Sequence, residues 1–190
     1  MLFKMLAEFE VEIGPDQPRL GVPWQEETGA LHFVDLASNA SLVDHIPESR
    51  DTAMRTALLA LNRDRSHYST AKCDLWTTED LDEEEREMFG AAWKHACYID
   101  VLFADACRRA SYEECEQRMR NWMPHLRAID VEDASVSIIL RQCDVRLGAE
   151  RVTHGFYWTI YVTGFAETGL AARDAWATAL LLTVEVIANR

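Results

Sequence analysis

Residues 152–190 constrain the fold more than any other stretch of the chain. They include HGFYWTIYVTGF at residues 154–165, whose aromatic and β-branched side chains favour an extended strand. Residues 170–188 are apolar on almost every side, which is typical of a buried helix. Their uninterrupted apolar part is shorter than the roughly 20 residues of a membrane span, because Arg173, Asp174 and Glu185 break it. We therefore expect a central strand that leads into the main core helix.

The rest of the chain alternates between strand and helix patterns. Period-two alternation predicts strands at residues 3–13 and 134–145, and extended runs are expected at residues 31–36, 67–76 and 97–104. Apolar residues at helical spacing predict helices that begin near Ser49, near Thr77 or Thr78, and at Ser111. This order indicates an α+β fold, with a mostly antiparallel sheet and helices packed mainly on one face.

The length of 190 residues fits a single α+β domain over residues 1–190. Residues 68–76 and 157–165 have similar aromatic spacing, and each run leads into a helix, which suggests a pseudo-repeat of roughly residues 1–95 and 96–190. The strand-helix-strand-strand-helix order of the second half resembles an incomplete ferredoxin-like unit. Two ferredoxin-like halves in tandem are therefore one hypothesis, and chance similarity is the other.

The net charge of −13 limits the classes of partner. A sequence-independent nucleic-acid binder needs Lys and Arg against phosphates, and an anionic membrane surface also attracts basic proteins. We therefore expect neither nucleic acid nor a membrane as a partner. The negative field would attract a basic protein or a cationic ligand. The alternative interpretation is that the acidity only keeps the protein soluble.

The cysteines and the N-terminus indicate a reducing, cytoplasmic location. The five cysteines are odd in number and form no CxxC pair, so neither a disulfide framework nor a zinc ribbon is expected. The N-terminal residues 1–10 reach acidic side chains too early to contain the apolar core of a signal peptide.

No catalytic or cofactor motif is present in the sequence. The chain contains no HExxH, G-x-S-x-G, Walker or G-x-G-x-x-G pattern. His95, Cys97 and Asp100 come nearest to a metal cluster, but in a strand Asp100 would point away from the other two. We therefore expect no cofactor and no metal. A protein without enzymatic activity is the favoured interpretation, and an enzyme is the alternative, since the sequence excludes none.

An aromatic sheet face is the feature that stands out. In the strand at residues 154–165, the side chains of Tyr157, Tyr161 and three neighbours share one face, opposite Trp158 and Ile160. Other strands would add Tyr68, Thr70, Lys72, Asp74 and Trp76, and Ser137, Arg141 and Cys143, to such a face. It is interpreted as a recognition surface, as an ordinary solvent face, or as a homodimer interface.

These features predict a non-enzymatic, acidic interaction module that docks a basic partner, such as an immunity protein that inhibits a nuclease toxin. The expected contact residues are Asp80, Asp82, Glu83, Glu84, Trp76, Tyr157, Tyr161 and Arg141. One alternative is a small-molecule-binding protein or enzyme of ferredoxin-like architecture, with a pocket between sheet and helices lined by Trp24, Trp76, Trp93, Arg50, Arg55 and Arg141. Another alternative is a structural homo-oligomer that buries the sheet face against its own copy.

Overall fold

The computed structural model describes residues 4–29, 31–64, 66–147 and 151–189. It is a mixed α+β fold built on one six-stranded, mostly antiparallel sheet. In chain order the strands and helices are β1 (Leu6–Glu12), β2 (Arg19–Val22), η1 (Ala40–His45), η2 (Pro47–Arg50), α1 (Thr52–Leu61), β3 (Tyr68–Thr78), α2 (Glu83–Phe89), β4 (Trp93–Phe103), α3 (Ala106–Ala110), α4 (Tyr112–Leu126), β5 (Ala134–Leu147), β6 (Arg151–Ala166) and α5 (Gly169–Asn189).

The sheet places β6 at its centre, as the sequence predicts. The strand order is β1-β5-β6-β4-β3, and β2 lies beside β5 beyond the end of β1. β6 is antiparallel to both β5 and β4, so β5 and β4 run parallel with β6 between them. Only β1 and β2 pair in parallel, both with β5. Strands from the two ends of the chain therefore meet in the same sheet.

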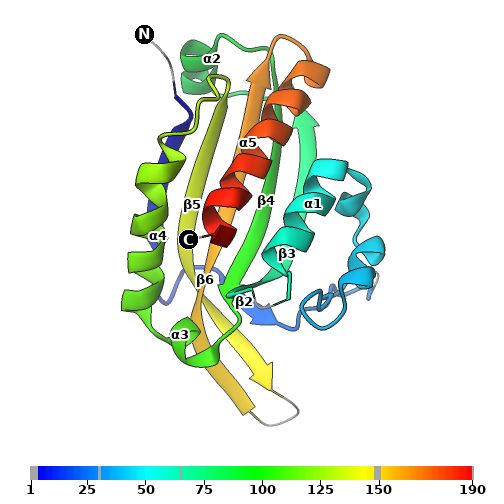
Figure 1. The fold of residues 1–190 in the computed structure, drawn as a ribbon, viewed down its shortest axis with the longest axis vertical. Coiled ribbons are helices and arrows are strands. Elements are labelled where there is room, and N and C mark those ends of the chain that lie inside the picture. The colour runs from blue at the N-terminus through cyan, green and yellow to red at the C-terminus, as the bar shows by residue number, and fades with distance from the viewer. Residues whose placement is uncertain (1–3, 30, 65, 148–150, 190) are drawn as a thin grey trace.

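Three helices cover one face of the sheet. In Figure 1, α4, α5 and α1 lie side by side in front of the strands, and β2 lies behind them. The core beneath these helices is strongly aromatic. Trp158 of β6 has its ring centroid 4.9 Å from that of Trp122 of α4 and 4.9 Å from that of Phe103 of β4. Edge-on pairs of this kind add about 1 kcal/mol each beyond the burial of their area.

Helix α5 lies unusually close to β6. An added Cβ at Gly164 of β6 would come within 2.3 Å of both the Ala172 carbonyl oxygen and the Trp176 backbone nitrogen. The absence of a side chain at Gly164 therefore lets the helix backbone rest on the strand. Trp176 is then fully buried beside His95, at a ring-centroid distance of 4.6 Å.

Several expected elements differ in the structure. Residues 31–36 are not a strand, and only a single bridge joins Gln25 to His32 there. A short strand, β2, forms instead within the expected loop and pairs with the end of β5. Asp51, not Ser49, caps α1, because its carboxylate accepts hydrogen bonds from the backbone N–H groups of Ala53 and Met54. Asp82 caps the acidic helix α2, because β3 continues through Thr78. The turn expected at Gly148 lies outside the described residues.

Helix α5 is buried on one side only, which corrects the expectation of a helix apolar all round. Trp176, Leu180 and Val184 face the core, whereas Leu170 and Leu181 are exposed. The tandem ferredoxin-like halves are not confirmed, because β1, β2 and β3 lie at the two sides of the sheet whose centre comes from β4, β5 and β6. Within the described ranges, no helix is long and apolar enough to cross a membrane.

The close approach of α5 to β6 can be tested at Gly164. We expect Gly164→Ala to lower the free energy of unfolding by about 3 kcal/mol or more, because the new methyl group meets rigid backbone rather than a side chain that can move. Gly21→Ala in β2 is the matched control. Nothing lies within 4 Å of a Cβ there, so stability should change by less than about 1 kcal/mol. Urea unfolding of both variants measures the difference, and equal stabilities would contradict this packing.

Candidate interaction surface

The sheet face opposite α1, α4 and α5 carries the side chains that the sequence singles out. The strand register places Trp76 beside Ala96 and Thr163, and Tyr98 beside Tyr161. The rings of Tyr98 and Tyr161 lie 5.9 Å apart between their centroids. We call this surface the open face; it consists of Leu6, Glu8, Glu10, Glu12, Asp74, Trp76, Tyr98, Asp100, Ser135, Ser137, Ile139, Arg141, Thr159, Tyr161 and Thr163.

A bulge in β3 decides which of its residues reach the open face. The pairing with β4 shifts between Thr70 and Cys73, so three steps along β3 match two along β4. One extra residue reverses the alternation of side chains between faces. Tyr68 and Thr70 are therefore not on the open face, which corrects their expected position beside Trp76. Tyr68 is buried against Phe103, with ring centroids 5.7 Å apart.

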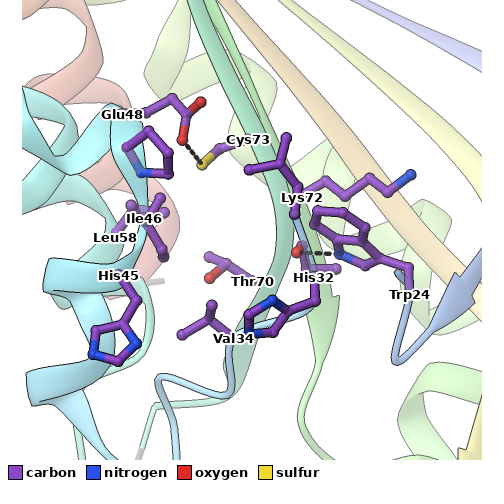
Figure 2. Close-up of a pocket in the computed structure, with 13 residues that line it drawn as sticks. Trp24, His32, Val34, His45, Ile46, Glu48, Leu58, Thr70, Lys72 and Cys73 are labelled. Carbon is purple, nitrogen blue, oxygen red and sulfur yellow. Dashed lines mark hydrogen bonds between the residues drawn. The ribbon is translucent and has the colours of Figure 1, made fainter. Parts of the chain in front are cut away.

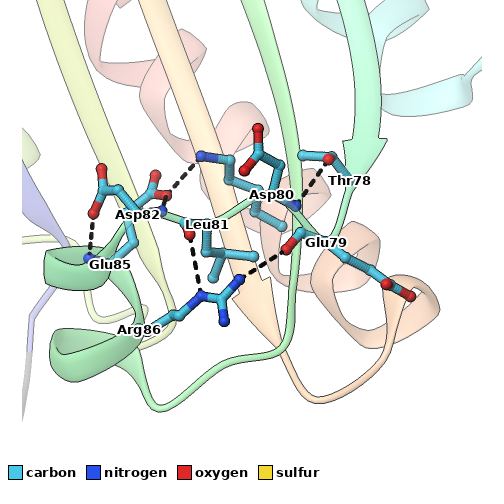
Figure 3. Close-up of polar contacts among 8 residues, drawn as sticks. Thr78, Glu79, Asp80, Leu81, Asp82, Glu85 and Arg86 are labelled. Carbon is cyan, nitrogen blue, oxygen red and sulfur yellow. Dashed lines mark hydrogen bonds and ion pairs between the residues drawn. The ribbon is translucent and has the colours of Figure 1, made fainter.

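The acidic segment, residues 80–87, lies next to the open face. The ring of Phe89 in α2 stacks on that of Phe165 in β6 at 3.9 Å between centroids. Lys94 of β4 forms a second contact between the sheet and α2, an ion pair in which its Nζ lies 2.6 Å from the Glu85 carboxylate. Figure 3 shows α2 on the opposite side of the sheet from α5. The fold thus places the acidic segment next to the open face, and both were predicted from the sequence as contact surfaces.

Only some of the acidic residues have a structural role. Asp82 and Glu85 form a capping box, in which each carboxylate accepts the backbone N–H of the other residue, at 2.7 and 3.0 Å. Asp80, Glu83 and Glu84 are exposed, and among the described residues no donor lies at hydrogen-bonding distance from their carboxylates. Their charges are therefore available to a partner, whereas Asp82 is partly committed to the helix.

Tyr157 and Arg141 were also predicted as contact residues, but their side chains are less available to a partner than those of Asp80, Glu83 and Glu84. Tyr157 is 4% exposed and packs with Leu20, Val22 and Cys143 beneath β2. The Arg141 Nε lies 2.7 Å from the Glu12 carboxylate, and its Nη1 donates to the Thr159 hydroxyl at 3.0 Å. The accessible aromatic side chains of the open face are thus Trp76, Tyr98 and Tyr161, and Arg141 serves the network beneath them.

Asp100 is a buried carboxylate that sequence analysis did not select as a contact residue. It is 5% exposed, and its Oδ1 accepts a hydrogen bond from the Thr159 hydroxyl at 2.7 Å. No cation in the described part of the chain forms an ion pair with it, because Arg141 is directed to Glu12. Burial raises the pKa of Asp100 to about 6, against the opposing effects of Thr159, Arg141 and Lys72. The alternation of residues 95–100 places Asp100 on the face opposite His95 and Cys97. No local pattern in the sequence indicates that its side chain is buried.

His95, Cys97 and Asp100, which come nearest to a metal cluster in the sequence, do not share one face of β4. His95 and Cys97 face the core and Asp100 faces the other way, as the strand pattern predicts. In the described ranges, no group of three metal-ligating side chains comes together. Burial raises the pKa of Cys97, Cys115 and Cys143 to about 12, and that of Cys73 still higher, so these four thiols stay protonated at neutral pH.

A small cavity lies at the outer edge of β3, as Figure 2 shows. Its volume is about 70 Å³, whereas ligand sites usually span about 300–1,000 Å³. Of the residues expected to line a small-molecule pocket, only Trp24 does so; Trp76, Trp93, Arg50, Arg55 and Arg141 do not. The Trp24 indole N–H donates to the Ala71 carbonyl oxygen at 2.8 Å, next to the bulge in β3. The cavity is also lined by His32, Val34, His45, Ile46, Glu48, Thr70, Lys72 and Cys73.

The buried carboxylate makes stability depend on pH in a defined direction. Because the pKa of Asp100 is near 6 when folded and 3.8 ordinarily, the folded chain holds this proton more tightly than the unfolded chain. The free energy of unfolding should therefore fall as pH rises from about 4 to 6. Asp100→Asn removes the charge, so we expect it to be more stable than the wild type by about 3 kcal/mol at pH 7 and about equal at pH 4.

Chemical denaturation of both proteins between pH 4 and 8 measures this difference. Burial lowers the pKa of His95, which gives an opposite pH dependence, but it is present in both proteins and cancels in the comparison. Asp74→Asn, on the exposed part of the same face, is the matched control and should change stability little at any pH. A difference for Asp100→Asn that does not vary with pH would contradict the assignment.

Comparisons with known proteins identify no relative of this chain. No protein-family model, no curated protein and no solved structure matches the chain. The function is therefore inferred from the open face and the acidic segment themselves.

Proposed function

We propose that this protein is a non-enzymatic interaction module that docks a basic protein on its open face and acidic segment. A nuclease toxin is one kind of partner with the required charge, and the module would then act as its inhibitor. The observation that carries the proposal is the convergence of exposed aromatic side chains and unpaired carboxylates on one side of the sheet. The proposal includes a single domain over residues 1–190 and a cytoplasmic location.

The centre of the open face has the chemistry of a binding hot spot. Trp76 is 36% exposed, and Tyr98 and Tyr161 are half-buried, so these rings are held by the sheet while still presenting surface. Trp and Tyr are the residues that most often dominate protein interfaces, because they bury much area at little entropic cost. Beside this centre, Leu6, Met88 and Phe89 line a surface depression of about 420 Å³ between β1 and α2. An apolar side chain of a partner would fit there.

The rim of the open face supplies negative charge. Glu8 and Glu10 lie exposed along β1, Asp74 lies on β3, and Asp80, Glu83 and Glu84 lie at the α2 end. Rim charges act mainly on the rate of association and on the choice of partner, since they attract a surface of opposite sign from a distance. This arrangement supports a basic partner over an ordinary solvent face.

A small-molecule site is the second candidate, and the cavity of Figure 2 supports it. The cavity is lined by Glu48, Thr70 and Lys72 beside the apolar Val34 and Ile46, with the Lys72 amine directed over the Trp24 ring. Its volume of about 70 Å³ is below that of ordinary ligand sites, so a protein partner remains the better-supported proposal. Self-association through the open face is less favoured, because it would bring the acidic rims of two copies together.

The proposal predicts a salt-sensitive heteromeric complex. We expect co-expression with the basic proteins encoded beside this chain in its natural host to give a complex that light scattering detects at low salt. Raising the ionic strength to about 0.5 M should weaken it, because screening acts on exposed charges. A salt-resistant homodimer without a partner would contradict the proposal and favour self-association.

Substitution at Trp76 tests whether the open face makes the contact. We expect Trp76→Ala to weaken the complex at least about tenfold, since a hot-spot aromatic residue contributes about 2 kcal/mol or more. Leu181→Ala is the matched control, because Leu181 is 40% exposed on α5, on the far side of the sheet. Equal effects of the two substitutions on the measured affinity would place the contact elsewhere.

A further inference from the structure

Strand β1 forms one edge of the sheet and carries a row of acidic side chains. It pairs with β5 on one side only, and Glu8, Glu10 and Glu12 all face the open face through their register with Ser137, Ile139 and Arg141. Glu12 is paired with Arg141, whereas no donor in the described ranges reaches the carboxylates of Glu8 and Glu10. The edge therefore presents two unpaired negative charges on alternate residues.

The backbone of β1 has unused hydrogen-bonding groups at this edge. In a parallel strand, alternate residues direct both N–H and C=O toward the same side. The Met5 N–H donates to the Ile129 carbonyl oxygen at 3.0 Å, and the Ala7 carbonyl oxygen accepts from the Arg127 Nε at 3.0 Å, so the odd-numbered residues point away from β5. Beyond Ala7, no described residue satisfies the outward groups of Phe9 and Val11.

The other face of the same edge is apolar. Helix α4 covers the start of β1, and Arg120 lies over the Phe9 ring with its guanidinium carbon 5.1 Å from the centroid. Further along the strand, Val11 and Ile13 are 39% and 37% exposed. The free edge at residues 9–13 thus carries carboxylates on one face and exposed apolar side chains on the other.

We propose that the edge of β1 at residues 9–13 accepts an extended strand of the basic partner, in which basic and apolar residues alternate. This inference rests on the proposed function and specifies how the partner binds. Backbone hydrogen bonds to Phe9 and Val11 would provide affinity, as in other cases of strand addition. Lys or Arg side chains would lie across from Glu8 and Glu10, and apolar side chains would cover Val11 and Ile13.

The same charges disfavour a second copy of this chain as the occupant. Two β1 strands paired edge to edge would place their acidic rows side by side on one face, and like charges across strands are destabilising. The opposite edge of the sheet is occupied around the bulge in β3. At β3, the Trp24 indole N–H binds the Ala71 carbonyl oxygen, and the Thr70 N–H donates to the Asn62 side-chain oxygen at 3.0 Å. Edge β1 instead combines outward backbone groups with a row of carboxylates, which suits a strand of opposite charge.

A synthetic peptide tests the inference without the natural partner. The probe is a seven-residue peptide of alternating Lys and Val, and its control has the same composition with the lysines and valines in two separate blocks. We expect the alternating peptide to bind and to slow hydrogen exchange of the Phe9 and Val11 amides, measured by NMR. The block peptide should bind more weakly and leave these amides unprotected, because it cannot match the two faces of the edge at once.

Two variants separate charge from backbone pairing. Glu10→Lys should weaken the alternating peptide roughly fivefold or more, since an attractive cross-strand pair becomes repulsive. Val11→Pro removes the outward N–H without touching the bonds to β5, so it should abolish the protection at Phe9. Glu185→Lys makes the same charge change on exposed α5 and is the control. Circular dichroism and urea unfolding confirm that each variant is folded.

The outcomes distinguish this inference from the proposed function. Protection of Phe9 and Val11 by the alternating peptide, lost in Glu10→Lys but kept in Glu185→Lys, supports strand addition. No protection, or equal binding of both peptides, overturns it. In that case a salt-sensitive complex with a basic host protein that Trp76→Ala weakens would leave the docking proposal intact.

Discussion

The packing of α5 directly on β6 is the contact on which the rest of the fold depends. Because Gly164 has no side chain, the helix backbone rests on the central strand, and Trp176 is fully buried beside His95. With α4 and α1 on either side, these helices bury one face of the sheet almost completely. The opposite face has only α2 and β2 with its following loop to cover its two ends. The open face is thus a direct consequence of where the helices pack.

Much of this arrangement follows from residue periodicity. The alternation in β6 separates Trp158 and Ile160 from Tyr161 and Thr163, and the structure confirms that the first pair is buried beneath helices. The central position of β6 and its connection to α5 were also predictable, since a long apolar helix has to cover a long strand. These features depend on local pattern, which is the information that a single sequence carries most directly.

The expectations that failed depend on interactions between distant residues. The bulge in β3 turns Tyr68 and Thr70 to the core, and no turn residue marks it in the sequence. β2 is a strand because β5 extends past the end of β1 and offers it a partner, not because residues 19–22 have a strong pattern of their own. Tyr157 is buried for the same reason, since β2 and the following loop fold over it. Long-range pairing of this kind overrides local propensity.

Asp100 gives the open face a buried charge that an ordinary solvated surface does not need. Keeping this carboxylate buried and ionised at neutral pH removes about 3 kcal/mol from a total stability that is usually only about 5–15 kcal/mol. A neutral Asn could accept the same hydrogen bond from Thr159 without that cost. A charge held at such expense is typical of a functional site. In the centre of a face rimmed by carboxylates, its negative charge would add to the attraction of a cationic surface, as the proposed function requires.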